Sequence, residues 1–293
     1  MQQRLLSRWG IEPVIVAEDP ETIAGTSTGD PLDDELTGRY LWDCAKVLYD
    51  LVADPDPYNT FSIRGKRVLE LGAGTGALSV GLSRAGAASV TCTDLPCHIP
   101  RIKATVEANT RDTGGSRVVM ARSGANEGAI HVAPLRWGDD TQALAMSGWP
   151  PAQAFPLSDG DDQAADTYIG SHSLVGTSVG TSTRRQKPVF DVIVMSEILY
   201  WPGLDLLVED TREPLRSTIV ELSHPGTSVF LVYKERWPDR EKGFLMSCEE
   251  HFKISQIPVI SLELPATTRE HPDSKAIKAV LLQRLPHADT ALS

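Results

Sequence analysis

The chain has 293 residues, of which 41% are hydrophobic and 23% charged, a size and composition that suit one large α/β domain with insertions. No apolar run approaches the ~20 residues that a membrane-spanning helix needs, so the sequence predicts no such helix. The formal net charge of −11 disfavours a long nucleic acid as partner, because lysine and arginine bind phosphate backbones, and would attract a basic peptide or protein patch instead.

The first 36 residues predict an irregular N-terminal arm. Their start lacks the apolar segment of a secretory signal peptide, so we expect a cytoplasmic protein, with the nucleus as the alternative location. The four cysteines, Cys44, Cys92, Cys97 and Cys248, form no C-x-x-C pair and have no histidine at metal-ligand spacing. We therefore expect neither a metal site nor disulfides.

Apolar runs alternate with helical patterns along most of the chain, and this alternation predicts a parallel sheet with right-handed crossovers. The fold class that we expect is α/β: a Rossmann-like, seven-stranded, mostly parallel sheet with helices on both faces and an N-terminal helical extension. In chain order, the expected elements are a helix from Thr37 to before Pro55, a strand at about 66–71, a helix at 76–86, a strand at 88–93, a helix at 98–111, one or two strands within 117–137, a strand at 190–195, a helix at 204–222, a strand at 229–233, a helix at 241–252, and strands at 253–260 and 276–284.

One stretch of different composition interrupts this alternation. Residues 144–188 contain an acidic cluster at 159–162 and a tract of small residues at 176–183, which together predict a flexible insertion. Because the entropy of closing a loop grows only logarithmically with its length, one domain can tolerate such an insertion. We expect one domain over 37–285, preceded by the arm at 1–36 and followed by a tail at 286–293.

Three alternate glycines, Gly72, Gly74 and Gly76, follow the first predicted strand, and the second predicted strand ends at Asp94. Glycine permits positive φ and lets the backbone approach a ligand closely at the start of the next helix, while the acid can bind ribose hydroxyls. Gly72, Gly74 and Ala77 also satisfy the loose dinucleotide fingerprint G-x-G-x-x-G/A. The loop alone therefore predicts a nucleoside cofactor without identifying it.

Polar or aromatic residues follow four of the predicted strands. In open α/β sheets, ligands bind beyond the carboxyl ends of the strands, so these tips are expected to share one site. The tips are Glu70 with the glycines, Asp94-Leu95, Trp137-Gly138-Asp139, and Ser196-Glu197-Ile198-Leu199-Tyr200-Trp201.

The pattern Glu70-x-Gly72-x-Gly74-x-Gly76 resembles motif I of the class I, seven-β-strand S-adenosylmethionine methyltransferases. The resemblance implies S-adenosyl-L-methionine as cofactor. It also implies that Glu70 orients the loop and the methionine end of the cofactor, and that Asp94 holds the ribose.

Further pieces narrow the resemblance to the family-16 protein methyltransferases, the methyltransferase-like 21 group, over roughly residues 37–284. In this family, a tryptophan equivalent to Trp137 lies against the adenine, and an early tryptophan, here Trp42, helps to close the cofactor pocket. The matching pieces are Thr37-Gly38, Trp42, Asp94-Leu95-Pro96, Asn109, Leu135-x-Trp137-Gly138, and Tyr233-Lys234-x-Arg236 with Phe244. Leu95 and Ser196, which lie at two of the tips, complete the expected cofactor-binding set.

The acceptor side departs from the family pattern. The family has Asp-x-x-Tyr after strand four, whereas this chain has Glu197-x-x-Tyr200, which is also similar to related enzymes that methylate histidine. The family acts on lysines of chaperones and translation factors, so the resemblance implies a protein substrate for what we expect to be a monomer. We expect Glu197 to attract and position the amine and Tyr200 to line its channel.

Three other functions stay open from the sequence. A small amine such as nicotinamide could be the acceptor, because the core is shared. An NAD-dependent oxidoreductase would need a hydride-transfer acid or base, and none is identified. A cofactor-binding interaction module without turnover is disfavoured by the intact loop and by Glu197-x-x-Tyr200.

Overall fold

The computed structural model describes part of the chain: Gly38, Thr141, Leu144 and residues 41–53, 61–110, 128–139, 190–199, 210–259 and 277–286. Within this part, no helix is long and apolar enough to cross a membrane. The expected arm at 1–36 and almost all of the expected insertion at 144–188 lie outside the described residues, as do Thr37, Tyr200 and Trp201.

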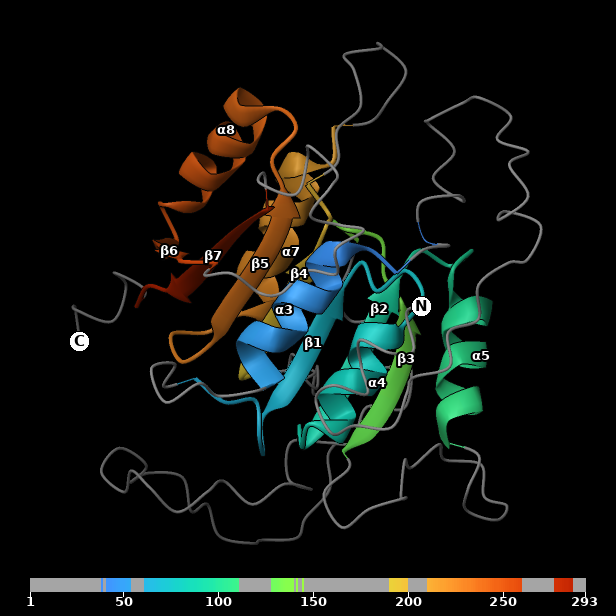
Figure 1. Cartoon of the computed structure of the whole chain (residues 1–293). Coiled ribbons are helices and arrows are strands. Elements are labelled where there is room, and N and C mark those ends of the chain that lie inside the picture. The colour runs from blue at the N-terminus through green and yellow to red at the C-terminus, as the bar shows by residue number, and fades with distance from the viewer. Residues whose placement is uncertain are drawn as a thin grey trace, which may run out of the picture.

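A seven-stranded sheet organises the described residues (Figure 1), and its strand order is β3-β2-β1-β4-β5-β7-β6. The first five strands in this order pair in parallel, and β7 pairs antiparallel with both β5 and β6. The strands are β1 Arg67–Leu71, β2 Ser89–Asp94, β3 Ala129–Pro134, β4 Val192–Ser196, β5 Ser228–Lys234, β6 Phe252–Ile257 and β7 Ile277–Arg284. The predicted Rossmann-like, mostly parallel sheet is confirmed.

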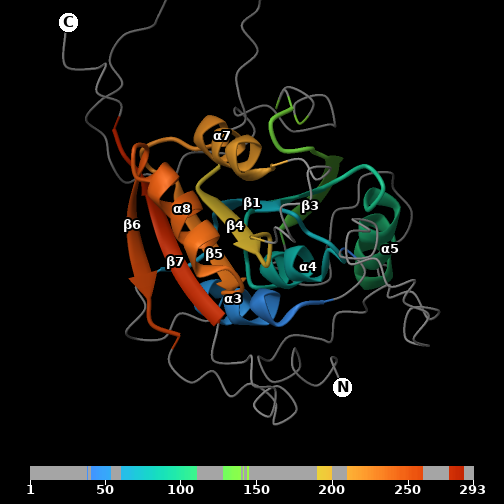
Figure 2. The same cartoon turned by 90° about the horizontal axis from the view of Figure 1, so that it is seen from above.

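Helices cover both faces of the sheet (Figure 2). On one face lie α3 Asp43–Ala53, α4 Ala77–Arg84 and α5 Ile99–Thr110; on the other lie α7 Arg212–Leu222 and α8 Pro238–Cys248. Successive side chains of a strand point to opposite faces of the sheet, so one strand contributes to the hydrophobic core on each face. In β4, Val192 and Val194 pack toward α3, whereas Ile193 and Met195 pack toward α7. A parallel strand buried on both faces requires the continuous apolar run that the sequence shows at 192–195.

Several helix boundaries differ from the expected ones. The first helix begins at Asp43 instead of Thr37, because Leu41 and Trp42 precede it as coil and the Trp42 carbonyl accepts a hydrogen bond from the Ala45 amide at 3.1 Å. An acid in the first turn also suits the positive end of a helix.

The two C-terminal helices also begin elsewhere than expected, and in both a proline in the first turn explains the start. The expected helix at 204–222 begins at Arg212, two residues before Pro214. The expected helix at 241–252 runs instead over Pro238–Cys248. Proline is favoured in a first helical turn because the amides there have no partner within the helix.

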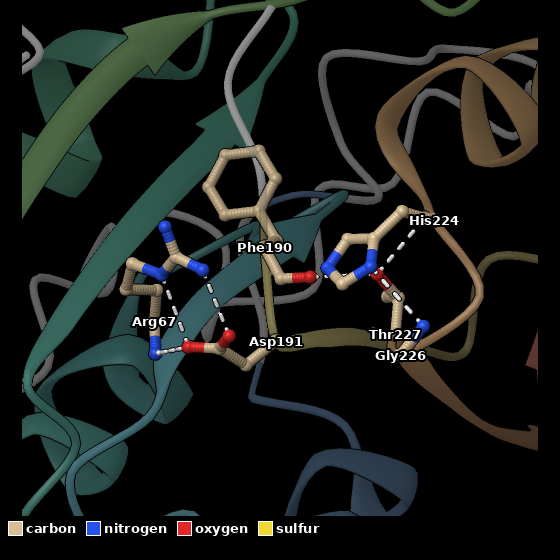
Figure 3. A network of polar contacts seen from close by, with 6 residues as sticks. All are labelled: Arg67, Phe190, Asp191, His224, Gly226 and Thr227. Carbon is tan, nitrogen blue, oxygen red and sulfur yellow. Dashed lines mark hydrogen bonds and ion pairs between the residues drawn. The ribbon is translucent and has the colours of Figure 1, made fainter. Parts of the chain in front are cut away.

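A polar network ties together the amino-terminal ends of β1, β4 and β5 (Figure 3). The Asp191 carboxylate accepts hydrogen bonds from the Arg67 amide at 2.7 Å, from its Nε at 3.1 Å and from its Nη2 at 2.9 Å. The Thr227 hydroxyl donates to the Phe190 carbonyl at 2.7 Å. Because this network joins the strand starts, it lies at the edge of the sheet opposite the four tips predicted to form the site.

Replacing Asp191 with alanine is expected to lower the free energy of unfolding by about 2 kcal/mol, because the partly buried Arg67 guanidinium loses its partner. The hydrogen bonds from Arg67 lower the pKa of Asp191 despite its partial burial. A depressed pKa means that this stabilisation is present above the unfolded pKa of about 3.9 and is lost as pH falls through the folded value.

Urea unfolding at pH 7 and pH 3 measures this effect, and the difference between wild type and Asp191→Ala should shrink at the lower pH. Asp210→Ala is the matched control, because Asp210 pairs with Arg212 two residues away on the surface and such exposed pairs contribute little. Equal losses in the two variants would contradict a special contribution from Asp191.

Candidate active site

The chain reverses its direction across the sheet between β1 and β4. From β1 it continues outward through β2 to β3, and then returns to β4 on the other side of β1. In open α/β sheets, a crevice opens beyond the carboxyl ends of the strands at such a switch point. The glycine loop follows β1 and Glu197 follows β4, so both lie at this switch point.

The glycine loop has the backbone conformation that glycine allows. Gly72, Gly74 and Gly76 have φ values of 69°, 56° and 77°, all in the left-handed region. Gly76 is the N-cap of α4, and the Ala73 amide donates to the Thr93 carbonyl of β2 at 3.0 Å. The loop thus turns from β1 into the N-terminus of α4 while attached to the neighbouring strand.

Glu70 is buried under this loop, with 1% of its surface exposed. Its carboxylate accepts a hydrogen bond from the Ser79 hydroxyl of α4. Burial raises the pKa of Glu70 to about 8, although the bond from Ser79 opposes the shift. Glu70 therefore joins β1 to the helix on the far side of the loop, which is how it can orient the loop.

Asp94 fastens the tip of β2 to the loop. One carboxylate oxygen, Oδ2, accepts a bond from the Gly74 amide at 2.6 Å, and the other, Oδ1, accepts one from the Leu95 amide at 2.7 Å. Burial raises the pKa of Asp94, while these two bonds and the nearby His98 oppose the rise. Each carboxylate oxygen can accept two bonds, so Asp94 keeps acceptor capacity for a ribose hydroxyl.

Two hydrophobic side chains from β3 and β4 tips close around Gly72. A methyl group in place of its hydrogen would lie 2.7 Å from Ile198 Cγ2 and 3.6 Å from Trp137 Cζ2. Trp137 is partly buried and packs on the core cluster that includes Ile198. The tips of β1, β3 and β4 therefore meet at one place, as the sequence predicted.

The loop behind Trp137 is held by α7. Gly138 has a φ of 86° and its amide donates to the Thr218 hydroxyl at 2.8 Å, and that hydroxyl donates to the Pro214 carbonyl at 2.9 Å. A Cβ at Gly138 would lie 3.1 Å from Pro214 Cβ. These contacts set the direction in which the chain leaves Trp137.

Ser196 ends β4, and Glu197 begins the loop beyond it. The Glu197 amide donates to the Val232 carbonyl of β5 at 2.8 Å, and its φ is 58°, the only positive φ of a non-glycine residue within the described part of the chain. The Glu197 side chain is 7% exposed and forms an ion pair with Arg236. Its second carboxylate oxygen accepts a hydrogen bond from the Cys44 thiol of α3.

The Cys44 thiol is neutral in this arrangement. Its burial, together with the adjacent Glu197 carboxylate, raises the pKa of Cys44 well above its ordinary value. None of the four cysteines forms a disulfide. Among the described residues, no group of three or more His, Cys, Asp or Glu side chains could hold a metal ion.

The structure brings together most of the predicted site. Glu70, Gly72, Gly74, Gly76, Asp94, Leu95, Trp137, Ser196 and Glu197 all lie at the carboxyl ends of β1 to β4. Trp42 lies just before α3, which packs on β4 and β5, and 42% of its surface is exposed. Tyr200, the second predicted acceptor residue, lies outside the described residues.

The sequence analysis gave no site role to four further residues at this edge. Ile198 packs on Gly72, and His98 is buried with its ring 2.6–2.9 Å from where a Cβ of Gly38 would lie. Cys44 and Arg236 bind Glu197. Arg236 carried a usable signal, because it lies two residues beyond the end of β5, whereas Cys44 lies in an amphipathic helix like any core residue.

The glycine loop, Asp94 and the aromatic ring of Trp137 lie at the edge of the sheet where open α/β folds bind their ligands. Residues 32–149 also match a family model described as lysine methyltransferase. The matched range contains Trp42, the glycine loop, Asp94 and Trp137, and it ends before Glu197.

Two curated relatives carry names of the same kind. Mouse EEF1A lysine methyltransferase 3 is 36% identical over 94 residues, which are 32% of this chain and 37% of that protein. Protein N-lysine methyltransferase METTL21A of Danio rerio is 23% identical over 217 residues, which are 74% of this chain and 69% of that protein. The chain thus matches little more than a third of the mouse relative's length and about two thirds of the fish relative's.

Solved methyltransferase structures are also similar to this chain. A TehB-like S-adenosylmethionine-dependent methyltransferase from Corynebacterium glutamicum has a TM-score of 0.41 and 15% identity, covering 85% of this chain and 91% of that one.

Proposed function

We propose that this protein is an S-adenosylmethionine-dependent protein N-methyltransferase that transfers a methyl group directly to a lysine side chain. The observation that carries the proposal is the meeting of the glycine loop, Trp137 and the β4 tip at the switch point of the sheet. The family match supports the class of reaction, and the names of the two relatives support a protein lysine as acceptor.

The cofactor residues follow from their positions. Asp94 receives the ribose hydroxyls, Trp137 lies against the adenine, and the loop of Gly72, Gly74 and Gly76 passes close to the methionine portion. Glu70 keeps the loop in place through Ser79. Leu95, Ser196 and Trp42 complete the proposed binding set at the rim of the site.

When bound, the cofactor supplies an already activated methyl group on a sulfonium centre. The protein's main task is therefore to align the acceptor nitrogen with the methyl–sulfur bond, and such orientation is worth roughly 7–11 kcal/mol. A lysine must also lose its proton, which costs about 4–5 kcal/mol at pH 7 from a pKa of about 10.4. Burial at the edge of the sheet lowers that cost, because a low-polarity environment disfavours the ammonium form.

Glu197 provides the acceptor side of the site in this account. Its carboxylate is 7% exposed and lies at the tip of β4, beside the strand that precedes the glycine loop. We assign it the orientation of the acceptor amine, with Tyr200 as a wall of the channel. The alternative acceptors are a histidine side chain or a small amine, and these would need an acceptor channel of a different shape.

Selective stabilisation by S-adenosylmethionine tests the cofactor assignment. At 100 times its dissociation constant, the cofactor should raise the free energy of unfolding by about 2.7 kcal/mol, whereas NAD at the same concentration should leave it unchanged. Thermal or urea unfolding with each ligand measures this effect. Stabilisation by NAD alone would replace the proposal with a dinucleotide-dependent function.

The proposed partner is a protein that presents a lysine, with chaperones and translation factors as the first candidates. The net charge of −11 favours a basic region around that lysine. A cytoplasmic or nuclear location and a monomeric state stay predictions from the sequence.

A further inference from the structure

We propose that Arg236 is a positioning residue that holds the Glu197 carboxylate in its working orientation; this inference rests on the proposed function. Arg236 lies in the loop between β5 and α8, and its guanidinium forms an ion pair with Glu197 at the tip of β4. Neither the family match, which ends at residue 149, nor the sequence pattern assigns it a role.

The ion pair is well shielded from water. The Glu197 side chain is 7% exposed and that of Arg236 is 22% exposed. The ion pair joins Arg236 Nη2 to Glu197 Oε1 without hydrogen-bond geometry, so the guanidinium, which stays charged, holds this oxygen by charge attraction. Cys44 donates to the other carboxylate oxygen, and Glu197 is therefore held from two sides by different elements.

Arg236 is itself fixed by a buried acid. Glu241 of α8 is 1% exposed, and its Oε1 accepts hydrogen bonds from the Arg236 amide at 2.8 Å and from the Trp237 amide at 3.2 Å. These bonds satisfy amides that precede the first turn of α8, and they set the course of the loop. The loop thus carries Arg236 to a defined place relative to Glu197.

The backbone at Glu197 makes such support necessary. With a φ of 58°, this residue occupies a conformation that costs a non-glycine side chain about 1 kcal/mol or more, and such conformations persist only where surrounding contacts enforce them. The Glu197 amide donates a hydrogen bond of 2.8 Å to the Val232 carbonyl, which fixes the main chain. Arg236 and Cys44 fix the side chain.

The fixed positive charge has a second consequence for the acceptor. A guanidinium beside Glu197 compensates the carboxylate, so the site as a whole attracts an incoming ammonium less strongly than an isolated acid would. It also favours the neutral amine over the ammonium, because like charges repel. Since the neutral amine is the nucleophile, the pair can orient the acceptor without retaining its proton.

A double-mutant cycle tests this inference. The measured quantity is the rate of label transfer from saturating tritiated S-adenosylmethionine into polypeptides of cell extract. Arg236→Ala should slow the transfer roughly 10- to 100-fold, as expected for a misplaced catalytic group, while its affinity for the cofactor changes less than about threefold. Arg236→Lys should recover part of the rate because it retains the charge.

The decisive comparison is made in the Glu197→Ala background. If Arg236 acts through Glu197, then Arg236→Ala should cause no further loss there, because its target is already gone. An equal loss in both backgrounds would assign Arg236 a merely structural role and overturn the inference. Arg240→Ala is the charge-matched control, because the Arg240 side chain of α8 lies over the ring of Trp237. This variant should have the wild-type rate.

The two proposals fail in different ways. Absence of transfer by the wild type would overturn the proposed function itself. Normal transfer by both the wild type and Arg236→Ala would overturn only the role of Arg236. Urea unfolding of the same five variants shows whether a slow variant is folded, and a folded Arg236→Ala with wild-type cofactor affinity is the expected result.

Discussion

Replacement of Gly74 with valine is expected to weaken S-adenosylmethionine binding by at least about 100-fold, or roughly 2.7 kcal/mol. Gly74 has a φ of 56°, which a β-branched residue adopts only with strain. Its amide binds Asp94, and a Cβ would lie 3.6 Å from the backbone of Gly38, so the additional methyl groups of valine have little room. Isothermal titration calorimetry measures the affinity.

Gly65→Val separates backbone strain from damage to the site. Gly65 has a φ of 72° and nothing lies within 4 Å of its would-be Cβ, and it precedes β1 at the opposite edge of the sheet. This variant should lose stability for the same conformational reason but bind the cofactor like the wild type. Equal loss of affinity in the two variants would show that general destabilisation, and not the glycine loop, governs binding.

Replacement of Glu197 with alanine is expected to lower the turnover number about 1000-fold, in the range found when a positioned catalytic group is removed. Cofactor affinity should change less than about threefold, because Glu197 lies on the acceptor side and Asp94 and the glycine loop hold the cofactor. The rate of methyl transfer at saturating cofactor and the dissociation constant from calorimetry test the two halves separately.

Glu235→Ala controls for the loss of an acid near the site. Glu235 lies one residue before Arg236 and pairs with Lys278 at 3.8 Å, away from Glu197. It should retain wild-type turnover. A loss of cofactor affinity in Glu197→Ala as large as its loss of turnover would refute the acceptor-side role.

The sequence was sufficient to predict the parallel core of the fold. Residues 192–195 form an uninterrupted apolar run, and such a run fits a strand that is buried on both faces. The three alternate glycines marked the loop because glycine adopts their positive φ values more easily than any residue with a Cβ. The first residue of a helix was harder to predict, because the helical spacing of apolar residues can extend into the coil before the helix. In α7 and α8 the better marker is a proline in the first turn, Pro214 and Pro238.

The contacts between distant segments could not be predicted in the same way. Cys44 and Glu197 are 153 residues apart, and their hydrogen bond depends on how α3 packs against β4 and β5. The cysteine has the burial and spacing of an ordinary core residue, so nothing local marks it. The sequence places Arg236 just beyond a predicted strand. Its pairing with Glu197 could not be predicted, because it depends on β4 and β5 being neighbours in the sheet.

The central claim is that the strand tips form one site that joins S-adenosylmethionine to a protein lysine. The most direct test incubates the purified protein with tritiated S-adenosylmethionine and cell extract, followed by mass spectrometry of each labelled species. We expect a methylated lysine in a polypeptide, with the rate of labelling lowered about 1000-fold when Glu197→Ala replaces the wild type. Label found only in small molecules, or on histidine, would contradict it.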